Sequence, residues 1–507
     1  MSQRPQNPLP ADAARAARFD LLIRGIGLAG ALAIILGAKL WLIANYGTST
    51  PFWDQWEEPR QIFRPYLTGE LTLRGLLAAH NEHRILLTRL VALAVFIAEG
   101  RWDPIALTLL NAVIHVAAIG LIVVMLARTL DVGRALLLAA FAAILFVPPF
   151  GWGNTLVGFQ TQFYLLVLLA AATLWVLYAS PAWSLRWWIG TLLGILSYFT
   201  IASGALALPA FVALAGLQFA RGERRGRAEF LGVVAHLAIS AILLLDIPRL
   251  PAPEEGIPVR TLHDWYEAIA IVASWPVAKP SWSVVPRALT AVGLALPAIV
   301  LALRLVRQRA PLRDPGWLII ALAGWTVLQM LAFIYGRGQT VLQSRYYDVL
   351  LIGPLANAAA LLQLQREPTF ARWRVGTVFA CIWFAAMVIG LGQKAFDDIP
   401  PDLAWRRETA AAQTENLKRF LATGDFAALA NKPRFQIPYP SAERLRDTVS
   451  DPIIRMFLPP ELLNQPEPAQ KLKGVALRQG HLLLPIGLAL LLVAALLALA
   501  DPSRGSK

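Results

Sequence analysis

Long runs of apolar residues, separated by short polar segments, make up most of this chain. Twelve of the runs reach or approach the length of a membrane-spanning helix, because about 20 residues rising 1.5 Å each cross roughly 30 Å of hydrocarbon. They cover residues 21–46, 105–126, 135–149, 160–178, 185–202, 205–220, 230–246, 286–306, 316–335, 347–364, 375–392 and 481–500. The pattern predicts an all-α polytopic membrane protein with about twelve transmembrane helices.

One further apolar run, residues 85–98, is too short to cross, at about 21 Å if helical, and Arg89 interrupts it. We expect it to form a helix along the outer surface. With this run left out, the dense Arg clusters, such as RGERRGR at 221–227, fall on one side of the membrane. The positive-inside rule makes that side cytoplasmic. We therefore predict that both termini are cytoplasmic.

Composition supports this interpretation. The chain of 507 residues is 57% hydrophobic and 15% charged, with a mean hydropathy of +0.55, whereas soluble domains carry roughly 25% charge. The net charge of +14 is explained by Arg-rich loops, so no nucleic-acid partner is expected.

The single cysteine, Cys381, excludes disulfides and thiolate metal sites. The first apolar run is too long for the core of a signal peptide and has no small-residue cleavage site, so it is expected to be an uncleaved anchor.

The polar segments on the outer side are residues 47–104, 150–159, 247–285 and 393–480. The last is soluble in character, and its stretch DLAWRRETAAAQTENLKRFLATGD has the pattern of an amphipathic helix. We predict three parts: a transmembrane module at 1–392 that includes the first outer loop 47–104, an extramembrane segment at 393–480, and a final transmembrane helix with a cytoplasmic tail at 481–507.

The first outer loop opens with TSTPFWDQWEEPRQIF, residues 48–63. Asp54 stands between Trp53 and Trp56, where a carboxylate can accept a proton from a hydroxyl while the indoles pack against a sugar ring. Glu57 and Glu58 are expected at the surface or on the acceptor side, with Glu57 contacting substrate. The alternative is an interfacial aromatic belt with a solvated acid.

A second motif, HNEHR at residues 80–84, precedes the surface helix. Asn81 is expected to cap that helix, with Glu82, His83 and Arg84 in its first turn. A helix N-terminus carrying Arg84 and His83 is suited to bind an anion such as phosphate, and His80 and Glu82 would contact substrate. The alternative is contact with lipid headgroups or with nearby acids.

Zinc held by His80, His83 and Asp54 is another interpretation of these motifs. The spacing is not that of HExxH, and no third histidine lies near in the sequence. We therefore expect no metal and no cofactor, with a divalent cation as the less favoured alternative.

Two more outer segments carry polar side chains at the ends of spans. The segment FGWGNTLVGFQTQF places Trp152, Asn154, Gln160 and Gln162 at the entrance to a span, where they are expected to contact substrate. For Gln160 and Gln162 the alternative is hydrogen bonding to neighbouring helices. His115 and His236 stand alone within spans and are expected to serve only in helix packing.

The other segment is YGRGQTVLQSRYYD, residues 335–348, with Arg337 and Arg345 at outer helix ends and Tyr346 beside them. Arg at an outer helix end runs against the inward charge bias. A phosphate ligand would explain both arginines, and Tyr346 would contact the substrate.

Taken together, FWDQWE, HNEHRI, WGNxxxGFQxQF, SRYYD and IPYPSAERLRD resemble an uncharacterised bacterial branch of the GT-C superfamily of membrane glycosyltransferases. These enzymes use polyprenyl-phosphate sugars, and the resemblance covers most of the chain as architecture. It implies that Asp54 is the catalytic carboxylate and that Arg345 binds the phosphate of the donor. The sequence departs from the family in lacking the usual acidic pair and in having HNEHR before the surface helix.

The resemblance implies an inverting glycosyltransferase of the bacterial inner membrane with its active site on the periplasmic face. Its partners would be the bilayer, a polyprenyl-phosphate sugar donor and a cell-envelope acceptor. The main alternative is a transporter or flippase of lipid-linked sugars, for which repeated halves and ionisable residues at mid-membrane are typical. An O-antigen ligase or polymerase is a further enzymatic alternative.

Overall fold

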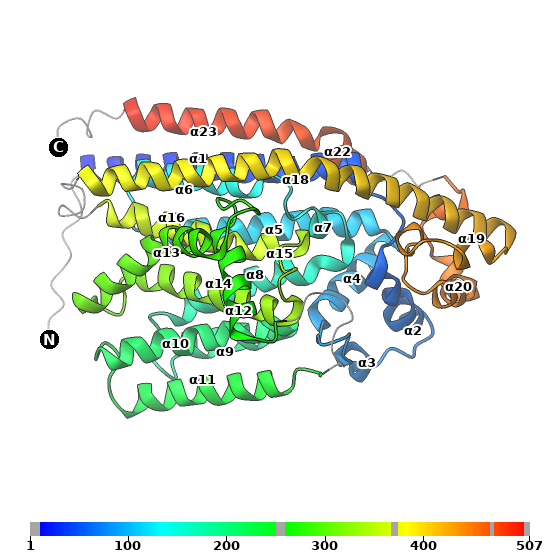
Figure 1. Cartoon of the computed structure of the whole chain (residues 1–507), viewed down its shortest axis with the longest axis horizontal. Coiled ribbons are helices and arrows are strands. Elements are labelled where there is room, and N and C mark those ends of the chain that lie inside the picture. Colours follow the sequence, from blue (N-terminus) through cyan, green and yellow to red (C-terminus); the bar gives the residue numbers. More distant parts are fainter. Residues whose placement is uncertain (1–10, 250–258, 367–373, 467–470, 501–507) are drawn as a thin grey trace.

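The computed structural model describes residues 11–249, 259–366, 374–466 and 471–500. The predicted cytoplasmic tail SRGSK and the first ten residues lie outside these ranges. Within them the protein is all-helical, and its long helices run side by side along one axis (Figure 1). A bilayer interior favours this arrangement because helices satisfy their backbone hydrogen bonds internally.

Among the described residues, ten helical stretches are long and apolar enough to cross a membrane. Their helices are α1 (Ala11–Tyr46), α5 (Pro104–Ala127), α8 (Thr161–Leu177), α10 (Ala207–Ala220), α11 (Arg227–Leu245), α13 (Val284–Arg307), α14 (Gly316–Arg337), α15 with α16 (Ser344–Leu350 and Ile352–Leu364), α18 (Arg374–Thr423), and α22 with α23 (Lys471–Gln479 and Leu483–Ala500). The chain is therefore a multi-pass membrane protein.

The other two predicted spans form shorter helices, α6 (Val132–Phe146) and α9 (Leu185–Tyr198), of 15 and 14 residues. At about 22 and 21 Å they do not reach the roughly 30 Å of a hydrocarbon core. They still lie within the bundle, α6 beside α1 and α9 beside α8 (Figure 1). The prediction of twelve spans is thus confirmed for ten.

The run expected to lie on the surface is helix α4 (Leu86–Glu99), which is not among the candidate spans. Gly47, directly after α1, lies against Ile105 in the first turn of α5. Helices α1 and α5 therefore meet at the same end of the bundle, as expected if α4 does not cross. We call this the site end. The short helices α2 (Arg64–Leu67), α3 (Leu73–Leu77), α19 (Ala427–Ala430) and α20 (Ala442–Ser450) also gather there (Figure 1).

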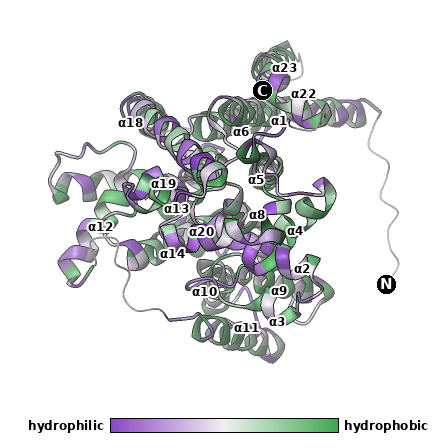
Figure 2. Cartoon of the chain, turned by 90° about the vertical axis from the view of Figure 1, so that its right-hand side faces the viewer, coloured by the Kyte–Doolittle hydropathy of each residue, from purple (hydrophilic) through white to green (hydrophobic). Residues whose placement is uncertain are grey.

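A second hydrophobic core, separate from that of the bundle, joins the first loop to the C-terminal segment at the site end. Phe63 stacks on Phe96 of α4 at 4.4 Å between ring centroids, and Phe96 meets Phe457 edge-on at 5.2 Å. Leu417 of α18 and Leu445 of α20 are fully buried in the same core. Figure 2 views the molecule from this end, where hydrophilic residues gather on α18 and α20.

Helix α18 has 50 residues and runs through the boundary predicted at residue 392 without interruption. Its length of about 75 Å exceeds the thickness of a bilayer. The predicted amphipathic helix of the extramembrane segment is therefore the second half of a transmembrane helix. Figure 1 shows α18 in yellow and gold along the whole bundle and beyond its site end.

The outermost helices expose large apolar side chains, as expected for surfaces that face lipid. Leu245 of α11, Val375 of α18 and Leu499 of α23 are 71%, 70% and 83% exposed. Exposed apolar surface of this extent would be unfavourable in water but is favourable against acyl chains.

The topology can be tested by cysteine labelling in a Cys381→Ser background. Glu415→Cys lies in the part of α18 beyond the bundle, whereas Arg225→Cys lies in the loop between α10 and α11, and both positions are exposed. We expect an impermeant thiol reagent to label position 415 in intact cells and position 225 only after permeabilisation. Labelling of position 225 alone in intact cells would show that the protein has the opposite orientation in the membrane.

Candidate functional site

Asp54 lies in a single helical turn, Trp53–Trp56, just beyond the end of α1. Trp53 has a positive φ of 52°, and its backbone N–H donates to the carbonyl of Pro438 at 2.7 Å. The C-terminal segment therefore fixes the turn. The Asp54 side chain is 50% exposed, and its Oδ2 lies 3.6 Å from Nε2 of the buried His80.

The HNEHR motif forms a tight turn rather than the start of a helix. His80 and His83 exchange backbone hydrogen bonds of 2.8 and 2.9 Å, and Asn81 has a φ of 50°. Asn tolerates this left-handed conformation better than most residues. Helix α4 begins only at Leu86 with Ile85 as its N-cap, so the predicted capping role of Asn81 is wrong. No helix N-terminus is therefore available at Arg84 to bind an anion.

His83 is held in its neutral form. Its Nδ1 accepts a hydrogen bond from the backbone N–H of Ala202 at 3.3 Å, and its Nε2 lies 3.4 Å from a Glu82 oxygen. Burial lowers the pKa of His83 to about 4, with the charges of His80 and Arg337 acting in the same direction and Glu82 opposing them. At neutral pH the ring therefore offers an N–H at Nε2 rather than a positive charge.

Asp54 is ionised at neutral pH. Burial alone would raise the pKa of its carboxyl, but the adjacent His80 and the positive charge of Arg345 outweigh that effect and hold the pKa below its usual value. A partly exposed carboxylate with a nearby imidazole can accept a proton from a bound hydroxyl.

Arg345 and Arg337 bring two guanidinium groups to the same place. Arg345 donates to Gln343 Oε1 at 2.9 and 3.2 Å, and its guanidinium lies 5.2 Å from the Tyr346 ring centre. Arg337 donates to the Tyr346 hydroxyl at 3.0 Å. Among the described residues, no carboxylate bonds to Arg345. The arrangement brings together Asp54 and these predicted site residues: His80, His83, Arg337, Arg345 and Tyr346.

Asn154 holds the backbone carbonyl of Arg345 in place. Its side-chain amide, fully buried in α7 (Trp152–Thr155), donates to the Arg345 carbonyl and to Asp348 Oδ2, each at 2.9 Å. A Cβ at Gly151 would lie 2.3 Å from the Asp348 carboxylate. The close approach of α7 to α15 thus requires glycine at position 151, directly before the WGN motif. Asn154 therefore supports the site instead of contacting substrate from the surface.

A buried polar cluster that the sequence did not predict lies beneath the site. Lys39 of α1 donates to Thr155 at 3.0 Å, and His115 Nε2 lies 3.8 Å from Asp348. The His115 ring stacks on Tyr164 at 4.4 Å. Lys39 could have been recognised from the sequence, because a lone Lys inside an apolar run is unfavourable in a membrane and usually functional. His115 was assigned to packing alone, yet it faces Asp348.

Several predicted site residues are committed to structural contacts. Trp56 is 1% exposed and meets Trp102 edge-on at 5.1 Å. Glu57, also buried, accepts hydrogen bonds from Tyr439 at 2.5 Å and Arg444 at 2.7 Å. The expectation of a surface group at Glu57 is therefore wrong, because a partner 387 residues away covers it.

Arg84 and Trp53 are also engaged. Arg84 donates to both carboxylate oxygens of Asp246, at 2.7 and 3.1 Å, which makes a planar two-point pair. Trp53 stacks on Phe435 at 5.6 Å with an interplanar angle of 23°. These contacts tie the first loop to α11 and to the C-terminal segment.

The remaining predicted residues lie around the site without a shared partner. Trp152 donates to Asp402 at 3.0 Å, and Gln162 donates to Gln160 at 3.1 Å. A Glu82 oxygen lies 3.4 Å from His83 Nε2. None of these contacts identifies a substrate.

The described residues include no group of three or more His, Cys, Asp and Glu side chains that could hold a metal ion. The arrangement of His80, His83 and Asp54 explains this, since His83 directs its Nδ1 to the backbone of Ala202.

A small cavity of about 10 Å³ lies behind His80, lined in part by Glu58, Thr88 and Arg89. This volume approaches the room that one water molecule requires. Glu58 is 2% exposed, and Trp102 donates to it at 3.1 Å. Burial raises the pKa of Glu58 to about 8, against the opposing hydrogen bonds from Trp102 and Gln55. The expected surface position of Glu58 is wrong.

Comparison with known proteins assigns no family to the chain. No protein-family model matches it. No curated protein matches its sequence at a significant level. What the geometry establishes is an all-helical multi-pass protein with an ionised acid, two histidines and two arginines gathered at one end.

The raised pKa of Glu58 predicts a specific dependence of stability on pH. Between about pH 4.5 and 8 the folded protein holds a proton that the unfolded chain has lost, so this contribution falls as pH rises and levels off above 8. Within this range the free energy of unfolding falls by on the order of 1.4 kcal/mol per pH unit.

Glu58→Gln should flatten the curve of thermal stability between pH 5 and 8. Glu415→Gln, at an exposed position, serves as the control. Parallel curves for Glu58→Gln and wild type would contradict the assignment.

Proposed function

We propose that this protein is an inverting glycosyltransferase that moves a sugar from a polyprenyl-phosphate donor to a cell-envelope acceptor. Catalysis would take place at the site end of the bundle, on the periplasmic face of a bacterial inner membrane. The acceptor would be a glycolipid, a polysaccharide or a protein. The proposal rests on the resemblance to the GT-C superfamily together with the chemistry of the site.

In the proposed reaction, the Asp54 carboxylate accepts the proton of the acceptor hydroxyl. The hydroxyl oxygen then forms a bond to the anomeric carbon from the face opposite the phosphate. The bond between that carbon and the phosphate oxygen breaks, and the polyprenyl phosphate leaves with the electron pair. No nucleotide is needed.

The single observation that carries the proposal is the electrostatic setting of Asp54. Its carboxylate is half exposed, stays ionised at neutral pH and lies within the electrostatic influence of His80, His83 and Arg345. A general base must be deprotonated and reachable by substrate. Asp54 meets both conditions.

Arg345 is the proposed ligand of the departing phosphate, with Arg337 beside it. Its guanidinium bonds to Gln343 rather than to an acid, so its positive charge is not neutralised by a described carboxylate. Charge that develops on a leaving phosphate is stabilised by such a fixed donor, an effect worth roughly 10²–10³ in rate for a single group. Arg84 no longer belongs to this proposal, because Asp246 engages it.

Transport of lipid-linked sugars is the second candidate function. The buried cluster of Lys39, His115 and Asp348 favours it, since ionisable groups inside a bundle often mark a substrate or proton pathway. Incubation of purified protein with polyprenyl-phosphate sugars and an acceptor extract separates the two functions. A transferase consumes the donor, whereas a transporter in liposomes moves it unchanged.

The proposed base is tested with Asp54→Asn. The amide preserves shape but cannot accept the proton, so we expect turnover to fall by roughly 10²–10⁴-fold while donor binding survives. Glu415→Gln, at an exposed position on α18, is the matched control and should keep full activity. Near-normal transfer by Asp54→Asn would remove Asp54 from catalysis, and loss of donor binding would favour a role in holding a cation.

The proposed phosphate ligand is tested with Arg345→Lys and Arg345→Ala. Lysine retains the charge but loses the planar two-point grip on phosphate, so we expect a moderate rise in the donor KM. Alanine should raise it by about tenfold or more, since hydrogen bonds to charged groups are worth about 1.5–3 kcal/mol. Arg419→Ala, at an exposed position on α18, should leave the donor KM unchanged. Equal donor KM in wild type and Arg345→Ala would exclude Arg345 from the site.

A further inference from the structure

A basic hollow lies at the end of the bundle opposite the candidate site. Two adjoining cavities of about 360 and 410 Å³ share Tyr178, Arg186 and Arg313 in their lining. The first also includes Arg128 and Trp175. Arg128 and Arg313 lie in the loops between α5 and α6 and between α13 and α14, whereas Trp175, Tyr178 and Arg186 lie in or beside the connection from α8 to α9. Cavities of this size are typical of small-ligand sites.

The arginines of the hollow have no acidic partner among the described residues. Arg186 and Arg313 make no hydrogen bond or ion pair there, and the Arg128 guanidinium lies 5.8 Å from the Trp175 ring centre. No Asp or Glu lines either cavity. Three uncompensated positive charges around one hollow repel one another, so an anion would be favourable there.

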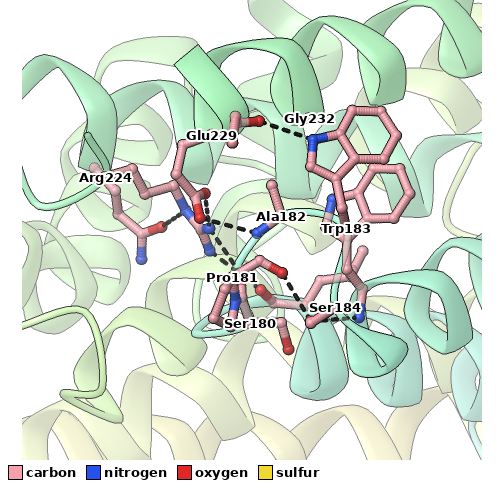
Figure 3. Close-up of polar contacts among 12 residues, drawn as sticks. Ser180, Pro181, Ala182, Trp183, Ser184, Arg224, Glu229 and Gly232 are labelled. Atoms are coloured by element: carbon pink, nitrogen blue, oxygen red, sulfur yellow. Dashed lines mark hydrogen bonds and ion pairs between the residues drawn. The ribbon is translucent and has the colours of Figure 1, made fainter. Parts of the chain in front are cut away.

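The loop between α8 and α9 is held rigidly by a fourth arginine (Figure 3). Arg224 is buried and donates to the backbone carbonyls of Ser180 at 2.9 Å, Tyr178 at 3.0 Å and Leu177 at 3.2 Å. It also pairs with Glu229 at 2.8 Å, and Glu229 accepts from the Ala182 N–H. Arg224 is thereby satisfied within the protein, and it shapes the wall from which Arg186 extends.

The other two loops are anchored in similar ways. Arg24 of α1 donates to the carbonyls of Ala127 at 3.0 Å and Leu130 at 2.5 Å. The indole N–H of the buried Trp317 donates to the Pro311 carbonyl at 3.2 Å. All three walls are therefore fixed before any ligand arrives, which lowers the entropic cost of binding.

We propose that this hollow binds the phosphate of an anionic phospholipid headgroup. Met125 and Leu318 line the first cavity together with the arginines, which gives it the apolar and cationic surface that a headgroup and its glycerol require. Trp175 and Tyr178 are residues that prefer the membrane interface. Basic pockets between transmembrane helices at the cytoplasmic face are suited to anionic lipid headgroups. This inference is independent of the proposed transferase activity.

The test is native mass spectrometry of the delipidated full-length protein, titrated with phosphatidylglycerol, phosphatidylcholine or sodium phosphate. Wild type should prefer phosphatidylglycerol over phosphatidylcholine. Arg186→Gln/Arg313→Gln should bind it about a hundredfold more weakly, since each of the two lost charge-assisted bonds removes about a factor of ten. Arg227→Gln/Arg366→Gln removes the same charge from exposed arginines that have no described partner and do not line the hollow. It should bind like wild type.

Equal phosphatidylglycerol binding by both double variants and wild type would overturn the proposal. So would displacement of the lipid by an equal concentration of sodium phosphate, which would identify a soluble anion as the ligand. If the first double variant does not remain folded, the single variant Arg186→Gln is compared with Arg227→Gln. Loss of lipid preference only in Arg186→Gln would support the proposal, and equal preference in both would overturn it.

Discussion

The absence of water in a bilayer interior is the constraint on which the rest of this structure depends. Backbone groups there must bond within the chain, so the long apolar runs become helices and polar chemistry collects at the two ends. One end holds the acid and histidines of the candidate site, and the other holds the arginine hollow. One exception is the cluster around Lys39 and Asp348 inside the bundle, where Lys39 donates to Thr155 and Asn154 donates to Asp348.

The candidate site depends on segments that are far apart in the sequence. Asp54 belongs to the first loop, and the residues that fix its turn belong to the C-terminal segment, through Pro438 and the Glu57–Arg444 pair. A shared hydrophobic core holds the two segments together. The C-terminal segment is therefore part of the framework of the site rather than a separate appendage.

The fold could be predicted from the sequence to the extent that local patterns determine it. Apolar runs located the helices, and the short run with Arg89 was correctly excluded from the spans. Asp54, His80 and Arg345 could be singled out because polar residues beside a membrane are conspicuous, and the structure places them near one another. Glu57 and Arg84 were misjudged because their partners, Arg444 and Asp246, lie 387 and 162 residues away. Pairings over such distances leave no periodic signal.

The continuous helix α18 makes the bilayer itself part of the site's geometry. Its far half bonds to the segment around Trp53, with Thr414 2.6 Å from Thr50 and Gln413 2.9 Å from the Phe435 carbonyl. Transmembrane helices change tilt when hydrocarbon thickness changes. The same helix therefore both crosses the bilayer and holds the segments around Asp54 in place.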